Sequence, residues 1–241
     1  MKKYSQIVQR VLEEADIVLI VLDARHPEKS TNQEMIQKIE ELGKKHIFVI
    51  NKVDLLSKEE QELLNVPHSV EVSAQKHLGT LRLYKKIMEI AHGERVTVGV
   101  VGYPNTGKST LINALKGRHS APTSSVSGYT KGVQKVSVSE KIMLIDTPGV
   151  IEEDGGDEIT LQMIGAIDIH KIKDPEGVAL KLIDEMKGKV ERHFSVAKHD
   201  DSYETLEEIA RAKHLVLKGA APDTMRAAKE IIGLVQKGKI K

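Results

Sequence analysis

Residues 102–109 of this chain read GYPNTGKS, which fits the pattern GxxxxGK[ST]. An apolar run over residues 96–101 precedes the octapeptide, and the segment STLINAL that begins at Ser109 has the pattern of a helix. In this strand–loop–helix context the pattern forms a phosphate-binding loop: its glycines let successive amides point at a polyphosphate, and the helix adds its positive end. The chain is therefore restricted to α/β folds that contain such a unit.

A second motif, NKVD at residues 51–54, stands before the phosphate loop in the chain. It follows the apolar run HIFVI, so it lies at the end of a predicted parallel strand, where ligands bind in open α/β sheets. Asp54 can accept two hydrogen bonds from the donor edge of guanine, which adenine does not present. Asn51 can bond the base or brace the phosphate loop, and the stem of Lys52 can cover a base face. Alone, NKVD has the simpler interpretation of a turn; beside a phosphate loop it indicates GTP.

Two shorter elements support this interpretation. Ser73-Ala74 closes a short predicted strand, and the amide of Ala74 can donate to the guanine oxygen, although this dipeptide alone is more often just a strand end. Thr130 lies in the polar loop over residues 124–132 and is predicted to be a second hydroxyl ligand of Mg²⁺, although an isolated threonine there is more often an ordinary turn residue.

The motif DTPG at residues 146–149 ends a predicted strand over residues 142–145. It would place the carboxylate of Asp146 near Mg²⁺ and the amide of Gly149 near the γ-phosphate. We therefore predict Mg²⁺ ligands at Ser109, Thr130 and Asp146, and catalytic roles for Lys108 and Thr130. The predicted GTP contacts are Asn51, Lys52, Asp54, Ser73, Ala74, Asn105, Thr106, Gly107, Lys108, Ser109, Thr110, Asp146 and Gly149.

The order of these motifs is unusual, because in most GTPases the phosphate loop comes first. Here the chain resembles the circularly permuted GTPases of the YlqF/YawG family, which are ribosome-assembly factors. The resemblance also covers DARHP at residues 23–27 and the stretch from KGAAPD at residues 218–223 to residue 240. It implies a GTP-hydrolysing switch that acts on the large ribosomal subunit precursor or its ribosomal RNA.

Two alternatives belong to other classes of function. The first is a nucleotide-gated RNA-binding or scaffold protein with negligible turnover. The second, an ATP-dependent kinase, is disfavoured by Asn51 and Asp54. Val150 stands where Ras-type enzymes carry a water-orienting glutamine, and its apolar side chain cannot orient water, so we expect slow unassisted hydrolysis. The resemblance implies that Asn105 is a K⁺ ligand, and that cation would add positive charge beside the phosphates.

Apolar periodicity predicts a doubly wound, mostly parallel sheet. Permutation is tolerable in such a sheet, since strand pairing does not depend on where the chain is cut. Helices are predicted over residues 31–43, 57–64, 79–92 and 108–117, after an amphipathic helix near the N-terminus, and strands over residues 17–23, 46–50, 69–73, 96–101, 133–139 and 141–145.

The character of the sequence changes after Gly149. Residues 151–158 hold five acidic residues and two glycines, which indicates a mobile switch segment. Helical periodicity then returns over residues 175–183, 204–210 and 223–235. We predict a GTPase domain over residues 1–164 and a small all-helical domain over residues 165–241.

Charge and composition limit the remaining functions. The net charge is +1, but residues 211–241 hold eight Lys or Arg against two acids, either an RNA-backbone surface or a solvated helix face. The absence of Cys excludes disulfides and thiolate zinc sites, and the ten His show no metal-binding spacing. No apolar run is long enough to span a bilayer, so we expect a soluble, cytoplasmic protein without a membrane partner.

Overall fold

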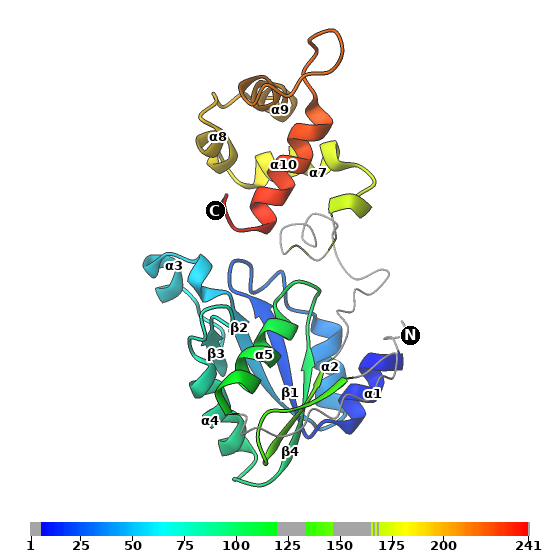
Figure 1. Cartoon of the computed structure of the whole chain (residues 1–241), viewed down its shortest axis with the longest axis vertical. Helices are drawn as coiled ribbons and strands as arrows, with labels where there is room; N and C mark the ends of the chain where they lie inside the picture. The colour runs from blue at the N-terminus through cyan, green and yellow to red at the C-terminus, as the bar shows by residue number, and fades with distance from the viewer. Residues whose placement is uncertain (1–5, 120–133, 147–164, 166, 168, 241) are drawn as a thin grey trace. The chain divides into compact units, whose positions relative to one another are not determined.

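The computed structural model of the chain describes residues 6–119, 134–146, 165, 167 and 169–240 (Figure 1). The chain folds into two compact units, Met1–Gly155 and Gly156–Lys241. The predicted domain boundary at residue 164 lies outside the described residues and stays a prediction. Within the described residues, no helix is long and apolar enough to cross a membrane.

The first unit contains one six-stranded sheet in the order β3-β2-β1-β4-β6-β5. Every neighbouring pair is parallel except β5 and β6. This confirms the predicted doubly wound, mostly parallel sheet, and each predicted strand agrees with the observed one to within two residues at either end. The strands are β1 (Ile17–Asp23), β2 (Lys45–Asn51), β3 (Ser69–Val72), β4 (Val96–Val101), β5 (Gln134–Ser137) and β6 (Ile142–Asp146).

Helices cover both faces of this sheet, as the continuous apolar character of its central strands requires. All seven residues of β1 are buried, and successive side chains of the strand point to opposite faces. Ile17, Leu19 and Val21 join the core cluster that holds the buried side chains of α4 (Thr80–Ile90) and α5 (Lys108–His119). Val18, Ile20 and Leu22 join the cluster of α1 (Gln6–Glu14) and α2 (Gln33–Glu41).

The sheet has a topological switch point between β1 and β4. The chain runs outward from β1 to β2 and β3 on one side, and from β4 to the β6–β5 pair on the other. Ligands of doubly wound proteins bind outside the carboxyl ends of the strands at such a point. Three of the predicted motifs begin at or directly after these ends: NKVD after β2, the phosphate loop after β4 and Asp146 at the end of β6.

The second unit is helical over its described residues, as predicted. Each of its three longer helices begins after an aspartate whose side chain accepts a hydrogen bond from a backbone amide of the first turn, a strong N-cap. Their apolar faces meet in one core cluster that includes Leu182, Leu206 and Ile231. The helices are α7 (Pro175–Glu185), α8 (Lys189–Phe194), α9 (Ser202–Ala212) and α10 (Thr224–Gln236).

The helix α8 is absent from the sequence prediction. It has six residues, too few to show a 3.6-residue period, and left-handed residues stand at both ends: Gly188 with φ 84° and Ser195 with φ 57°. Its place depends on tertiary packing, since Val190 is fully buried in the core of the unit.

Candidate nucleotide-binding site

The phosphate loop turns sharply as it leaves β4. Gly102 has φ 143°, and a Cβ atom there would lie 2.5 Å from the carbonyl oxygen of Val21 in β1. A side chain would therefore collide with the neighbouring strand. Thr106 Oγ1 donates to the carbonyl of Tyr103 at 2.9 Å, which closes the loop from inside.

Lys108 lies folded over this loop. Its Nζ donates to the carbonyl oxygens of Gly102 at 2.9 Å and Tyr103 at 2.7 Å, and the residue is only 5% exposed. Burial lowers the pKa of Lys108 to about 8, against the opposing effect of the Asp146 charge. The loss of hydration of this buried ammonium group is only partly offset by its protein partners, so binding of an anion beside it would be favourable.

Asp146 supplies the matching carboxylate at the end of β6. Burial raises its pKa, opposed by the charge of Lys108 and by a hydrogen bond from the Ser109 hydroxyl. Its Oδ1 atom is buried and has no hydrogen-bond partner among the described residues. An unpartnered carboxylate oxygen beside a serine hydroxyl is a donor set that Mg²⁺ accepts, so these two residues fit the predicted ion.

Asn51 connects three segments of the site. Its Nδ2 donates to the carbonyl of Thr106 at 2.9 Å, and its Oδ1 accepts from the amide of Ala74 at 3.0 Å. Asn51, Ala74 and Thr106 are all buried. The sequence left open whether Asn51 contacts the base or braces the loop, and the structure shows the bracing contact. The predicted donation from the Ala74 amide to guanine stays a prediction.

Asp54 is oriented from the turn after β3. Ser73 Oγ donates to Asp54 Oδ1 at 2.6 Å, and the amide of Lys76 donates to Ser73 Oγ at 3.2 Å. Asp54 itself lies in a short 3₁₀ turn, Val53–Leu55, directly after β2. The predicted base-reading carboxylate is thus held by a neighbour that the sequence also placed in the site.

Asp23 is a site residue that sequence reasoning missed. It is fully buried at the end of β1, and its carboxylate accepts from Arg25 Nε at 2.8 Å, Arg25 Nη2 at 2.6 Å and Lys52 Nζ at 2.8 Å. Burial alone would raise the pKa of Asp23, but the hydrogen bonds from Arg25 and the charge of Lys52 outweigh it and hold the pKa below its usual value. An acidic residue that ends an entirely apolar strand was the available signal.

The remaining predicted residues divide into two groups. Asn105, Ser109 and Thr110 are exposed along the phosphate loop and the first turn of α5, and Asn105 has φ 59°. Thr130 and Gly149, together with Val150, lie outside the described residues, as does the acidic segment over residues 151–158. Across the described part of the chain, no group of three His, Cys, Asp or Glu side chains could hold a metal by itself.

The phosphate loop, the NKVD tetrapeptide and the turn after β3 therefore meet at one edge of a parallel sheet, with the motifs in permuted order along the chain. This arrangement defines the class: a circularly permuted P-loop domain for guanine nucleotides.

Comparison with known families gives the same class. The family model described as RsgA GTPase matches residues 1–154, and the model described as 50S ribosome-binding GTPase matches residues 97–218. The fold of two solved structures, GDP-bound TM YlqF and GNP-bound YlqF from T. maritima, is similar to that of this chain, with TM-scores of 0.68 and 0.66. Each is 24% identical to this chain and covers 96% of it, and the match takes in 94% and 92% of those chains. The chain belongs to the circularly permuted, YlqF-like GTPases, which confirms the resemblance seen in the sequence.

Curated relatives cover nearly all of the chain. GTP-binding protein MJ1464 of Methanocaldococcus jannaschii is 38% identical over 246 residues, and the match takes in 98% of this chain and 65% of that protein. Nucleolar GTP-binding protein 2 of Yarrowia lipolytica is 32% identical, over 99% of this chain and 50% of that protein. The chain thus spans about half to two thirds of the length of these relatives.

Proposed function

We propose that this protein binds GTP with Mg²⁺, hydrolyses it to GDP and phosphate, and acts as a nucleotide switch in assembly of the large ribosomal subunit. The observation that carries the nucleotide part is the pair of hydrogen bonds made by Asn51, which join the base-reading motif to the phosphate loop and to Ala74. The match to the family model described as 50S ribosome-binding GTPase supports the ribosomal part.

In this proposal the chain contributes charge and position to the chemistry. Lys108 gives up its two carbonyl partners for the β and γ phosphates, where its charge offsets the charge that develops on the transferred phosphoryl group. Mg²⁺, held by Ser109, Thr130 and Asp146, would neutralise the phosphate oxygens. Val150 offers no group to orient water, so turnover should be slow until a partner supplies one.

Two measurements test this function against its alternatives. Competition between GTP and ATP should show strong preference for GTP, and equal affinities would indicate a different nucleotide class. Turnover should rise when large-subunit precursors are added. Tight GTP binding without turnover, with or without these particles, would instead support the nucleotide-gated scaffold.

Asn105 is the proposed ligand of a K⁺ ion beside the phosphates. It is exposed in the phosphate loop, with the left-handed backbone conformation that asparagine tolerates. Hydrolysis should be faster in KCl than in NaCl at matched ionic strength, and Asn105→Ala should remove the difference. Identical rates of the unmodified protein in both salts would leave Asn105 as a loop residue without an ion.

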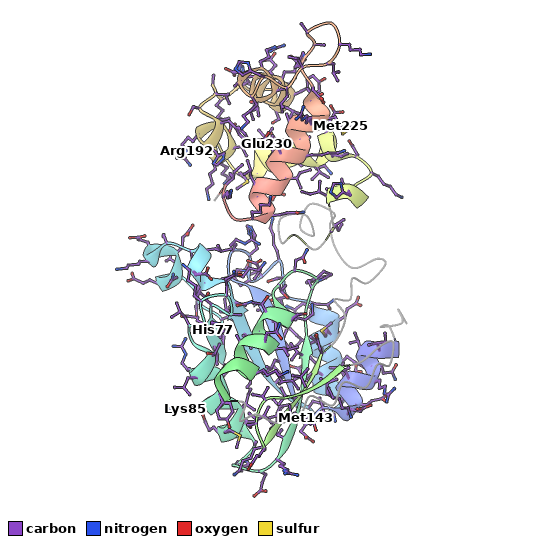
Figure 2. The ribbon with its side chains drawn as sticks, viewed as in Figure 1. His77, Lys85, Met143, Arg192, Met225 and Glu230 are labelled. Carbon is purple, nitrogen blue, oxygen red and sulfur yellow. The ribbon has the colours of Figure 1, made fainter. Side chains whose placement is uncertain are left out.

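RNA contact is proposed for the α9–α10 end of the second unit. Two cations of the basic tail are already paired, Arg211 with Glu207 and Lys213 with Glu230, the latter labelled on α10 in Figure 2. Lys218, Arg226 and Lys229 are exposed and have no ion pair among the described residues. These three side chains are therefore positive charges that are available to an RNA backbone, as are the exposed Lys237 and Lys239 after α10.

The test is charge reversal with a matched control. Replacing Lys218, Arg226 and Lys229 together by Glu should weaken binding to ribosomal RNA strongly and flatten its salt dependence. Lys181→Glu, at an exposed position of α7, should have little effect. If Lys181→Glu lost about one third of the binding free energy lost by the triple variant, in proportion to its smaller charge change, attraction by net charge alone would be indicated.

Coupling between the two units would make the protein a switch. The segment over residues 150–165 joins the phosphate-sensing motif to the helical unit in the sequence, so we propose that GTP and GDP favour different placements of that unit. RNA should then tighten binding of a GTP analogue by the same factor by which the analogue tightens binding of RNA. Equal RNA affinities in both nucleotide states would reject the coupling. The cytoplasmic location stays a prediction.

A further inference from the structure

Asp23, Arg25 and Lys52 form a buried ionic cluster at the carboxyl ends of β1 and β2. The strand register pairs Asp23 with Asn51, so Asp23 lies directly beside the NKVD motif, to which Lys52 itself belongs. The side chains of Asp23 and Arg25 are 0% and 8% exposed, whereas that of Lys52 is 22% exposed. The two inner members are therefore enclosed by protein, and the outer member reaches the surface of the site.

The cluster has a fixed part and an adjustable part. Arg25 binds both carboxylate oxygens of Asp23 through Nε and Nη2, a planar two-bond contact that sets the orientation of the carboxylate. Two backbone contacts also hold Asp23: its amide donates to Ser30 Oγ at 3.0 Å, and the amide of Arg25 donates to Oδ1 at 3.1 Å. Lys52 contacts the carboxylate through one hydrogen bond, from its Nζ to Oδ2 of Asp23.

Lys52 needs such an anchor. Its backbone is left-handed, with φ 69°, a conformation that a lysine adopts only when its surroundings impose it. Burial lowers the pKa of Lys52, and the charge of Asp23 acts against that change by favouring the ammonium form. Asp23 thus keeps the end of a flexible four-carbon stem charged and in one place.

We propose that Asp23, whose carboxylate is fixed by Arg25, is a positioning residue. It holds the side chain of Lys52 in the conformation in which the stem packs on the face of guanine. The inference rests on the proposed function, because it assumes that guanine lies beside residues 51–54. A stem that packs on the face of the base contacts neither its hydrogen-bonding edge nor the phosphates. The contribution should therefore be the same for GTP, GDP and GMP, and it should not affect the choice between guanine and xanthine.

Asp23→Asn should weaken binding of GTP, GDP and GMP by a similar factor, about tenfold, as expected for loss of one charge-assisted hydrogen bond. The isosteric amide carries no charge and cannot hold both cations. Ser30→Ala is the matched control, since it removes a hydrogen bond from the Asp23 amide and leaves the carboxylate contacts in place. It should lower the melting temperature without changing nucleotide affinity.

A double-mutant cycle shows whether Asp23 acts through Lys52. Calorimetric GDP affinities would be measured for Asp23→Asn, Lys52→Met and the double variant. If Asp23 only positions Lys52, the double variant binds as weakly as Lys52→Met alone. Additive losses, or wild-type affinity of Asp23→Asn, would overturn the inference.

Misfolding of the variant, failure of the proposed function and failure of the positioning role remain distinguishable. If Asp23→Asn does not fold, Arg25→Met takes its place in the cycle, because it removes the clamp and leaves the bond from Lys52 to Asp23; the same lack of additivity is expected. If the wild-type protein binds no guanine nucleotide, the proposed function itself is wrong. If the wild type binds and the cycle is additive, the positioning role alone is rejected.

Discussion

The side-chain amide of Asn51 lies where a side chain at residue 107 would stand: a Cβ atom on Gly107 would come within 2.2 Å of Asn51 Nδ2. The two residues belong to motifs on different loops, yet each requires the other, because Asn51 uses the space above the glycine to reach the carbonyl of Thr106. This contact joins the ends of β2 and β4 and does not depend on which strand comes first in the chain. The site therefore tolerates a permuted order.

Gly107→Ala should abolish nucleotide binding. The methyl group would displace Asn51, and the backbone at φ 95° strains any residue with a Cβ atom, so we expect a loss of about 1–3 kcal/mol in the free energy of unfolding as well. Calorimetric titration with GDP and chemical denaturation measure the two effects.

Gly117 provides the control for this substitution. It lies within α5, and a Cβ atom there would meet nothing within 4 Å. Gly117→Ala should therefore keep nucleotide binding and raise the free energy of unfolding by about 0.5–1 kcal/mol. Full binding by Gly107→Ala would show that Asn51 moves aside freely and that its bracing contact has no importance.

Binding of GTP should take up protons near pH 8.5. Lys108 has a pKa of about 8 in the free protein, and phosphates beside it would raise that pKa. At pH 8.5 about 0.8 of the lysines are uncharged before binding, so about 0.8 of a proton should be taken up per GTP. The affinity must then fall as the pH rises above about 8, because the protonated form is the one that binds.

Calorimetry in two buffers of different ionisation enthalpy measures this uptake. The binding heats should differ at pH 8.5 and converge near pH 7, where Lys108 is already mostly charged. Heats that are independent of the buffer at pH 8.5 would show that the free lysine carries its proton, and that the loop carbonyls of Gly102 and Tyr103 compensate its burial fully.

Sequence patterns predicted the architecture well because apolar periodicity, glycine positions and motif context all indicated the same strands and helices. The run of seven buried residues in β1 and the strand–loop–helix around Lys108 have local causes, namely apolar character and glycine at defined positions. The C-terminal helices were predictable for a similar reason, since their apolar spacing coincides with aspartate N-caps such as Asp174 and Asp223.

What the sequence did not reveal depends on contacts between distant segments. The position of Asp23 at the end of an apolar strand was visible in the sequence, but its partners were not, because only the register of β1 and β2 places it beside Asn51 and Lys52. The bracing role of Asn51 could be recognised only once the positions of three loops were known. The helix α8 could be recognised only from its packing in the core of its unit. Such relations have no local signature in the chain.

Asp54→Asn should change the base that the protein selects. The carboxylate is oriented by Ser73, and an amide in its place offers a donor where guanine needs an acceptor. We expect at least about a hundredfold weaker GTP binding and improved binding of xanthosine triphosphate, whose edge matches the amide. Competition titrations measure both, and unchanged GTP affinity would remove Asp54 from the base site.

His199 should make the stability of the second unit depend on pH. Its Nε2 lies 2.6 Å from Glu208 Oε2 and its Nδ1 lies 3.3 Å from Glu204 Oε2, and the hydrogen bond to Glu208, with the charges of Glu204 and Asp200, raises the pKa of His199 above its usual 6.5. Because the pKa of His199 is higher in the folded state than its usual value of 6.5, the ion pairs stabilise the folded unit fully at pH values below 6.5. This stabilisation is lost as the pH rises through the pKa of the folded state.

His199→Gln isolates this contribution, because glutamine keeps a hydrogen-bond donor and has no charge to lose. Thermal unfolding of the wild type and of the variant would be followed from pH 5.5 to pH 9. The wild type should be the more stable protein at the acidic end, and the difference should shrink as the pH rises, since the imidazolium loses its proton between Glu208 and Glu204. A difference that stays constant across this range would mean that the histidine contributes through packing alone and that the ion pairs with the two glutamates add nothing to folding.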